Sequence, residues 1–217
     1  MISPYQVVKD FESALCEYIG SKHAVTTTSC TMAILLACEW QKHSHSIRAV
    51  VRGKEGDYRP TSMPTITIPK YTYVGVPMSI IHAGFNVKFT DIGWCGHYAL
   101  DPFLIIDSAR WLTNGIYSPG EFRCLSFHWT KTLSIGQGGA ILHDNDEADE
   151  WLRMMRFDGR KEGLKPRSQK SWVMGHHCYM SPRDAAEGLH RLSVLPRHNE
   201  PIPNDNYPDL SALEIFK

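Results

Sequence analysis

Segments with helical spacing alternate with short β-prone runs along this chain. Apolar residues recur at helical spacing between Gln6 and Tyr18, and Gly20 follows as a helix stop signal. A β-prone run at 24–27 leads into a second apolar helix, which the pattern predicts over 32–40. This alternation indicates an α/β domain.

The middle of the chain predicts a strand, a short helix and a second strand. The strands are expected at 65–69 and 86–91, with the helix over 76–82, whereas the polar stretch 43–64 is expected to be a loop. A continuous apolar run at 103–107 is typical of a buried parallel strand. We therefore expect a three-layer α/β/α architecture with a mostly parallel sheet.

The stretch from Arg123 to Leu142 predicts a strand, a loop and a strand, with Lys131 in the loop ahead of a glycine cluster. Helices are expected over 147–157 and 181–195, separated by a charged loop. The prediction thus places one domain over residues 1–195.

After this domain, residues 196–217 contain four prolines and little periodicity. We expect them to form an extended tail on the surface of the domain.

Composition limits the class of protein. Of the 217 residues 42% are hydrophobic and 21% charged, as in an ordinary globular protein, and the formal net charge is zero, so no basic excess points to nucleic acid. No apolar run has membrane-spanning length, and the N-terminus lacks a signal-peptide layout. The six cysteines lack CxxC spacing, and no cluster has the spacing of metal ligands. These features predict a cytoplasmic protein with reduced thiols, without nucleic-acid, membrane or metal partners.

Four positions carry candidate chemistry, and each has a purely structural alternative. The hydroxyl-rich turn 28–31 is either a simple helix cap or an anion site at a helix N-terminus. Tyr73, after a strand, either closes the core or offers a flat face to a ring. Asp107, at a strand end, either forms a turn or binds a ligand. Lys131 is either a surface charge or an amine for covalent chemistry.

Taken together, the four positions are the groups that pyridoxal 5'-phosphate requires. Its phosphate needs a helix N-terminus, its ring a flat contact, its pyridine nitrogen a carboxylate and its aldehyde a lysine. The chain offers all four in one order, which favours Lys131 as the site of attachment over a surface charge.

Several motifs extend this pattern to most of residues 7–195, and through them the chain resembles the DegT/DnrJ/EryC1/StrS family of sugar-nucleotide aminotransferases. The resemblance implies a fold type I pyridoxal-phosphate enzyme, represented by its large domain, with the small C-terminal domain largely absent. The matching stretches are Phe11-Glu12, Tyr18–Val25, Ser29–Ala33, Ile68–Val74, Ile106–Arg110, Ser126–Lys131, Gly136–Gly139, Arg153–Gly159 and Gly175–Leu195.

The resemblance also implies roles for individual residues. Lys131 would carry the cofactor as a Schiff base and move protons, Asp107 would hold the ring nitrogen, and Tyr73 would stack on the ring. The remaining implied cofactor contacts are the phosphate-binding Cys30, Thr31, Met32 and Ser126, the ring-contact position Arg110, and His177, which would reach a phosphate across a homodimer interface.

The chain departs from the family pattern where substrate is handled. Arg110 stands where the family has Gln or His, His177 and Tyr179 replace Asn and Arg, and one βα segment before Phe103 is missing. Two hypotheses stay open. The first is an aminotransferase that passes an amino group from glutamate or glutamine to a keto-sugar nucleotide. The second is a degenerate member that binds the cofactor, or keeps only the fold, and acts as a binding or regulatory protein. Family dehydratases lack the lysine, so Lys131 argues against that variant.

Overall fold

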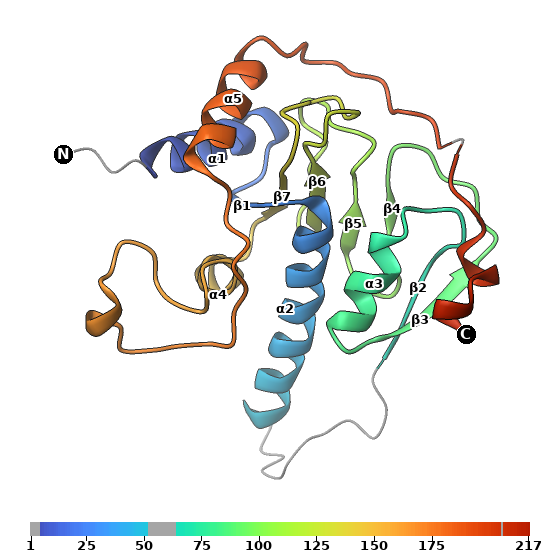
Figure 1. Cartoon of the computed structure of the whole chain (residues 1–217), viewed down its shortest axis with the longest axis horizontal. Coiled ribbons are helices and arrows are strands. Elements are labelled where there is room, and N and C mark those ends of the chain that lie inside the picture. Colours follow the sequence, from blue (N-terminus) through green and yellow to red (C-terminus); the bar gives the residue numbers. More distant parts are fainter. Residues whose placement is uncertain (1–4, 52–63, 205) are drawn as a thin grey trace.

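A computed structural model describes residues 5–51, 64–204 and 206–217 of the chain. Helices and strands alternate in sequence, and together they form an α/β domain (Figure 1). In chain order the helices and strands are α1 (Gln6–Ile19), β1 (His23–Thr27), α2 (Cys30–Val51), β2 (Thr65–Pro69), α3 (Gly75–His82), β3 (Asn86–Thr90), β4 (Tyr98–Ala99), β5 (Ile105–Asp107), β6 (Phe122–Ser126), β7 (Gly139–His143), α4 (Asp146–Arg156) and α5 (Pro182–Ser193), with 3-10 turns at Pro166–Ser168, Leu210–Ala212 and Glu214–Phe216.

The main sheet has five strands in the order β1-β7-β6-β5-β4. Only β5 and β6 pair in parallel within it, whereas β7 runs antiparallel to both β1 and β6, and β4 runs antiparallel to β5. The expectation of a mostly parallel sheet is therefore wrong in this detail, because the sheet is mixed. The pattern of apolar runs predicts buried strands well, but it does not record the direction of each strand.

The predicted strand, helix, strand unit in the middle of the chain is confirmed. Strands β2 and β3 pair in parallel, and α3 connects them. They form a separate two-stranded sheet beside the main one (Figure 1). A single bridge between Thr67 and Asp101 ties this unit to the segment that precedes β5.

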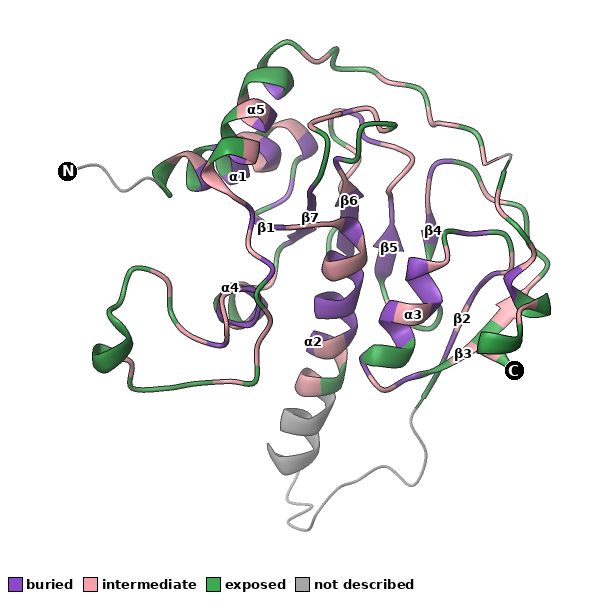
Figure 2. Cartoon of the chain, in the orientation of Figure 1, coloured by how far each residue is buried: buried purple, intermediate pink, exposed green. Residues whose placement is uncertain are grey.

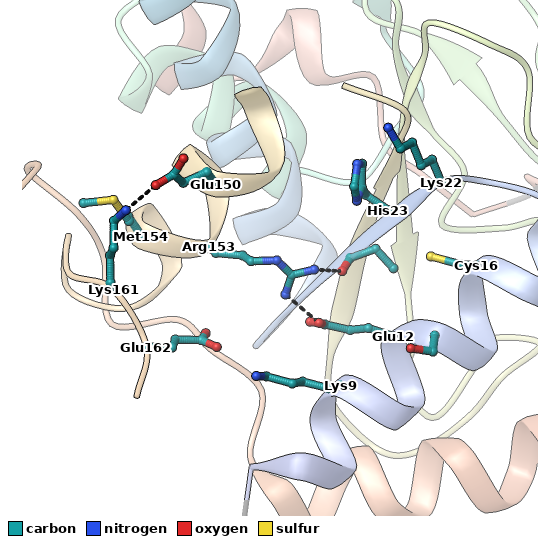
Figure 3. Close-up of a pocket in the computed structure, with 12 residues that line it drawn as sticks. Lys9, Glu12, Cys16, Lys22, His23, Glu150, Arg153, Met154, Lys161 and Glu162 are labelled. Carbon is teal, nitrogen blue, oxygen red and sulfur yellow. Dashed lines mark hydrogen bonds and ion pairs between the residues drawn. The ribbon is translucent and has the colours of Figure 1, made fainter. Parts of the chain in front are cut away.

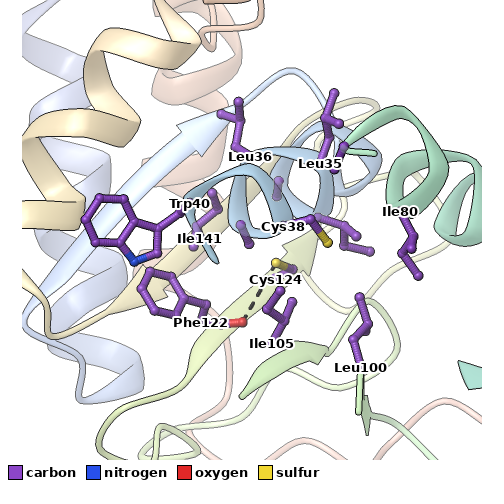
Figure 4. Close-up of a cluster of buried hydrophobic side chains, with 14 of the residues drawn as sticks. Leu35, Leu36, Cys38, Trp40, Ile80, Leu100, Ile105, Phe122, Cys124 and Ile141 are labelled. Carbon is purple, nitrogen blue, oxygen red and sulfur yellow. Dashed lines mark hydrogen bonds between the residues drawn. The ribbon is translucent and has the colours of Figure 1, made fainter. Parts of the chain in front are cut away.

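Helices cover both faces of the main sheet, as the predicted three layers require. Alternate residues of the central strands point to opposite faces, so Cys124 and Ile141 pack towards α2, α3 and α4, whereas Leu125 and Leu142 pack towards α1 and α5. Strands β1, β5, β6 and β7 are buried almost throughout (Figure 2). Figure 4 shows the larger cluster, in which α2 supplies residues that cover β5, β6 and β7. The fold class is confirmed.

Local signals set the ends of several helices. Gly20 ends α1 in the left-handed region, with φ of 91°, which costs a glycine little. The side chain of Asn145 caps α4 and that of Ser181 caps α5, each accepting a hydrogen bond from a backbone N–H of the first turn. These ends agree with the spacing in the sequence to within one or two residues.

Helix α2 is longer than the sequence pattern predicts. The loop expected from His43 onward is wrong up to Val51, since the helix continues to that residue. Trp40 and His43 both pack on the ring of Trp151 in α4, and the His43 ring stacks on it at 5.0 Å. This tertiary contact continues the helix through a polar sequence that has little amphipathic pattern of its own. The rest of the expected loop, at 52–63, lies outside the described residues.

Residues 196–204 and 206–217 form what we call the C-terminal segment. It is largely extended, as expected, but it is more than a surface tail, because Leu210 is completely buried. The segment crosses from α5 to the side of the domain that carries β2 and β3 (Figure 1). Within the described part of the chain, no helix has both the length and the apolar character needed to cross a bilayer.

Candidate active site

Three strands of the main sheet run in the same direction and end at one edge. Strands β5 and β6 are parallel, and β1 is also parallel to β6 because each pairs antiparallel with β7. Asp107 ends β5, Ser126 ends β6, and the turn after β1 leads into α2. In the register, Gly139 at the start of β7 lies opposite both Thr27 and Ser126. Open α/β sheets hold ligands at such an edge.

A cavity of about 270 Å³ opens at this edge. It brings together most of the residues that the sequence singled out, which come from four separate segments of the chain. The predicted residues that line it are Cys30, Thr31, Tyr73, Asp107, Arg110, Ser126 and Lys131. In the described part of the chain, no group of three or more His, Cys, Asp or Glu side chains is arranged to hold a metal ion.

Asp107 is a buried carboxylate, 5% exposed, at the inner wall of this cavity. Its Oδ1 accepts a hydrogen bond from the backbone N–H of Ala109 at 3.0 Å, and its Oδ2 accepts one from the Tyr98 hydroxyl at 2.9 Å. Burial raises the pKa of Asp107, although both hydrogen bonds and the charge of Lys131 oppose this effect. A carboxylate in this position can accept a hydrogen bond from a cationic N–H group.

Lys131 is half-buried in the loop between β6 and β7. Its backbone N–H closes a turn onto the carbonyl oxygen of His128 at 2.9 Å. Burial lowers the pKa of the Lys131 amine, the Arg110 charge lowers it further, and Asp107 acts in the opposite direction. The amine is therefore more readily neutral, and more nucleophilic, than a lysine on an open surface.

The N-terminus of α2 forms a third wall of the cavity. The Ser29 hydroxyl accepts a hydrogen bond from the backbone N–H of Met32 at 3.2 Å, which caps the helix. A Cβ atom at Gly139 would lie 2.5 Å from the backbone nitrogen of Cys30, so only glycine allows β7 to approach this turn so closely. Met32 itself does not line the cavity, whereas Cys30 and Thr31 do. Burial raises the pKa of the Cys30 thiol well above its usual range, so the thiol stays neutral.

Tyr73 lies at the opening of the cavity and is 54% exposed. Its ring sits against the start of α3, where a Cβ atom on Gly75 would come within 2.7 Å of the ring and 2.9 Å of the Thr31 hydroxyl. The glycine therefore leaves room for both groups at the cavity wall.

Arg110 lies at the cavity edge and contacts the C-terminal segment. Its Nε donates to the carbonyl oxygen of Ile202 at 3.2 Å, and its Nη1 donates to the hydroxyl of Tyr207 at 3.3 Å. A further Nη2–H donates to the carbonyl oxygen of Pro203. The guanidinium also lies 5.5 Å from the centre of the Tyr207 ring.

His177 lies outside the cavity. Its side chain is 70% exposed, and its Nδ1 pairs with Asp158 at 3.0 Å. The role across a dimer interface that the resemblance implies for His177 stays a prediction.

Several residues that line the cavity or contact its lining escaped the sequence analysis. Tyr98 bonds Asp107 and also the hydroxyl of Thr72, at 2.6 Å, but it lies on the two-residue strand β4, which has no periodicity to reveal it. Residues that line the cavity without having been predicted include Thr72, Trp94, His128, Thr130, Gln137 and Tyr207. Of these, Thr72, His128, Thr130 and Gln137 lie inside quoted motifs, which is a signal that could have found them.

A larger cavity, of about 650 Å³, lies elsewhere, between α1, β1, α4 and the loop after α4 (Figure 3). Its wall contains Glu12 and Arg153, which pair at 2.7 Å, and at its rim Lys161 pairs with Glu150. Oppositely charged side chains here pair with one another, and the Glu12–Arg153 pair links α1 to α4 around β1, the strand at one end of the main sheet. None of the predicted site residues lines this cavity.

The fold is that of the large domain of fold type I pyridoxal-phosphate-dependent transferases, and solved structures of such proteins superpose on it. An aminotransferase from Helicobacter pylori, PseC, involved in the biosynthesis of pseudoaminic acid, matches with a TM-score of 0.66 at 18% identity, over 86% of this chain and 57% of its own. AtS13 from Actinomadura melliaura matches with a TM-score of 0.68 at 20% identity, over 87% of this chain and 60% of its own.

The chain belongs to the DegT/DnrJ/EryC1/StrS aminotransferase family, whose family model matches residues 1–105 and 108–201. Among curated relatives, the spore coat polysaccharide biosynthesis protein SpsC of Bacillus subtilis is 25% identical over 87% of this chain. The UDP-4-amino-4,6-dideoxy-N-acetyl-beta-L-altrosamine transaminase of Campylobacter jejuni is 24% identical over 89% of it. The chain spans 57% and 58% of the lengths of these two relatives.

Proposed function

We propose that this protein is a pyridoxal-phosphate-dependent aminotransferase that moves an amino group from glutamate or glutamine to a keto-sugar nucleotide. The observation that carries the proposal is the single cavity that holds Lys131, Asp107 and the N-terminus of α2. Membership of the aminotransferase family and the transaminase activity named for the Campylobacter relative support the reaction and the substrate class.

The residues of the cavity fit the cofactor. A cavity of about 270 Å³ is just below the usual range for ligand sites, roughly 300–1,000 Å³, and suits one compact group. A buried carboxylate and a half-buried amine both face it, and a capped helix N-terminus forms another wall. When bound, pyridoxal 5'-phosphate supplies an aldehyde that reacts with amines and a protonated ring that withdraws electrons from the attached carbon.

Lys131 is the residue that we propose for cofactor attachment and for proton transfer. Burial and the nearby Arg110 charge lower the pKa of its amine, so a larger fraction is neutral at a given pH. A neutral amine attacks an aldehyde and accepts a proton from carbon, whereas an ammonium group does neither. The half-buried loop position limits competition from water.

Asp107 is proposed to hold the ring nitrogen. The hydrogen bonds from Tyr98 and Ala109 fix both oxygens of its carboxylate, so the group is already oriented before a ligand arrives. An ionised carboxylate in a buried site favours a protonated partner, which keeps the ring nitrogen charged.

The turn before α2 and Ser126 are proposed to hold the phosphate. Backbone N–H groups at Cys30 and Thr31 belong to the first turn of a 22-residue helix, whose dipole favours an anion at this end. Tyr73, half-exposed at the cavity opening, is proposed to stack on the ring.

Two spectroscopic steps test this proposal. The purified protein mixed with pyridoxal 5'-phosphate should develop a visible absorption band, and the Lys131→Ala variant should not. Addition of L-glutamate or L-glutamine should then remove the band, because the amino group moves to the cofactor. A band that neither donor removes would support the other reading, in which the protein binds the cofactor without transferring an amino group.

We also propose a homodimer, with His177 directed to the cavity of the second copy. The exposed His177 side chain, outside the cavity of its own chain, supports this arrangement. Sedimentation velocity at micromolar concentration should show a dimer. A stable monomer that still binds the cofactor would remove His177 from the site.

A further inference from the structure

Tyr207 brings the C-terminal segment into the cavity. It lines the same cavity as Lys131 and Asp107, although it lies 76 positions beyond Lys131 in the sequence. Its ring is nearly parallel to that of Trp94, another lining residue, with an angle of 16° and a centre-to-centre distance of 6.4 Å. The segment therefore forms part of the cavity wall, facing the residues proposed to bind the cofactor.

Hydrogen bonds anchor the segment on both sides of Tyr207. Before it, the backbone N–H of Ile202 donates to the carbonyl oxygen of Arg110 at 2.8 Å, and the Asn204 side chain donates to that of Tyr71 at 3.1 Å. After it, the backbone N–H of Leu210 donates to the carbonyl oxygen of Lys70 at 3.0 Å.

An ion pair and a buried side chain strengthen the second anchor. The Lys70 amine lies 3.3 Å from a carboxylate oxygen of Asp209, and the neighbouring Leu210 is completely buried. A segment held at two points in this way presents Tyr207 in a defined position.

The same segment fixes Arg110. Ile202, Pro203 and Tyr207 all accept hydrogen bonds from the guanidinium, which leaves its positive charge at the cavity edge. The charge is close enough to Lys131 to act on it, since it is the largest influence on that amine after burial. Loss of the segment's contacts would release the guanidinium from this position.

We propose that the C-terminal segment is a functional wall of the cavity, in which Tyr207 shields Lys131 and the backbone around Pro203 positions the Arg110 guanidinium beside it. The wall controls how readily amines, aldehydes and water reach Lys131. Tyr207 thereby becomes a further residue of the site, and Arg110 a positioning residue that acts on Lys131 through its charge. The proposal rests on the function proposed for Lys131, but its test needs no cofactor.

The test measures the chemical reactivity of Lys131 in the protein without pyridoxal 5'-phosphate. A small acetylating reagent is added at a series of pH values, and peptide mass spectrometry follows the modification of Lys131 relative to the exposed Lys22. The rate at high pH reports access to the amine, and the midpoint of the pH profile reports its pKa. Tyr207→Ala should raise the high-pH rate several-fold, and Tyr207→Phe, which keeps the ring, should leave it nearly unchanged.

Ile215→Ala is the matched control, because Ile215 belongs to the same segment but its side chain is exposed outside the cavity. Its high-pH labelling rate and the midpoint of its pH profile should match those of the unmodified protein. Arg110→Gln should move the midpoint upward, since removal of a positive charge raises the pKa of Lys131. Equal high-pH rates in Tyr207→Ala and the unmodified protein would overturn the shielding role, and an unmoved midpoint in Arg110→Gln would overturn the positioning role.

Circular dichroism separates these outcomes from unfolding. If Tyr207→Ala does not fold, Tyr207→Leu, which fills more of the same space, takes its place in the same measurement. A failure of the proposed function has a different signature, because the protein would then form no visible band with the cofactor while the labelling differences persist.

Discussion

Glu12 of α1 is the centre of a buried ion network, and its replacement gives a quantitative test of the fold. The side chain is 3% exposed, pairs with Arg153 and Arg156, and accepts hydrogen bonds from the backbone N–H and the hydroxyl of Thr26 at 2.9 and 2.8 Å. Burial alone would raise its pKa, but the Arg156 and Arg153 charges outweigh burial and lower the pKa to about 2.

This lowered pKa sets the size of the expected effect. The pKa of Glu12 falls from the ordinary value of 4.5 to about 2, and each pH unit corresponds to about 1.4 kcal/mol. The ionised carboxylate therefore contributes about 3 kcal/mol to the free energy of folding. Because the pKa is lower in the folded state, this stability is fully present above about pH 4.5 and is lost as the pH falls towards about 2. Glu12→Gln should therefore lower the free energy of unfolding by about 3 kcal/mol near neutral pH.

Urea unfolding, followed by circular dichroism from about pH 7 down to about pH 3, measures the effect. The difference in free energy of unfolding between the unmodified protein and Glu12→Gln should shrink by about 2 kcal/mol over this range, because only the unmodified protein has the carboxylate to protonate. Glu17→Gln, at an exposed position of the same helix, is the control and should change stability little. A difference that is the same at both ends of the pH range would refute the reasoning.

Three further predictions concern the site and the helix caps. Gly139→Ala should lower the free energy of unfolding by about 1–3 kcal/mol and weaken cofactor binding, because its Cβ would collide with the backbone at Cys30. Gly93→Ala, with open space around it, is the control. Equal urea midpoints for the two variants would contradict the close approach. Ser181→Ala should lower the free energy of unfolding by about 1 kcal/mol through loss of the cap of α5, and an unchanged urea midpoint would show that the cap contributes nothing. Asp107→Asn should still form the visible band but lose the cofactor faster on dialysis, since a neutral amide binds a protonated ring nitrogen less well; retention equal to that of the unmodified protein would exclude the proposed contact.

Local sequence signals predicted most of the elements. Gly20 ends α1, the apolar run before Asp107 forms β5, and the helical spacing after Ser181 forms α5, because each of these features depends on residues that are close in sequence. The position of Asp107 at a strand end followed from the same local pattern.

Features that depend on distant residues could not be predicted in the same way. Helix α2 continues past His43 because Trp151, more than a hundred positions later, packs on it. The hydrogen bond from Tyr98 to Asp107 and the place of Tyr207 in the cavity both arise from tertiary packing, and the direction of β7 follows from its pairing with β1 and β6.

The central claim is that Lys131 carries the cofactor, and chemical trapping tests it most directly. The protein is incubated with pyridoxal 5'-phosphate, reduced with borohydride and digested, and the modified peptide is identified by mass spectrometry. We predict one dominant modification, at Lys131, that is absent from the Lys131→Arg variant. No modification, or modification spread over exposed lysines such as Lys9 and Lys22 with Lys131 untouched, would contradict the claim.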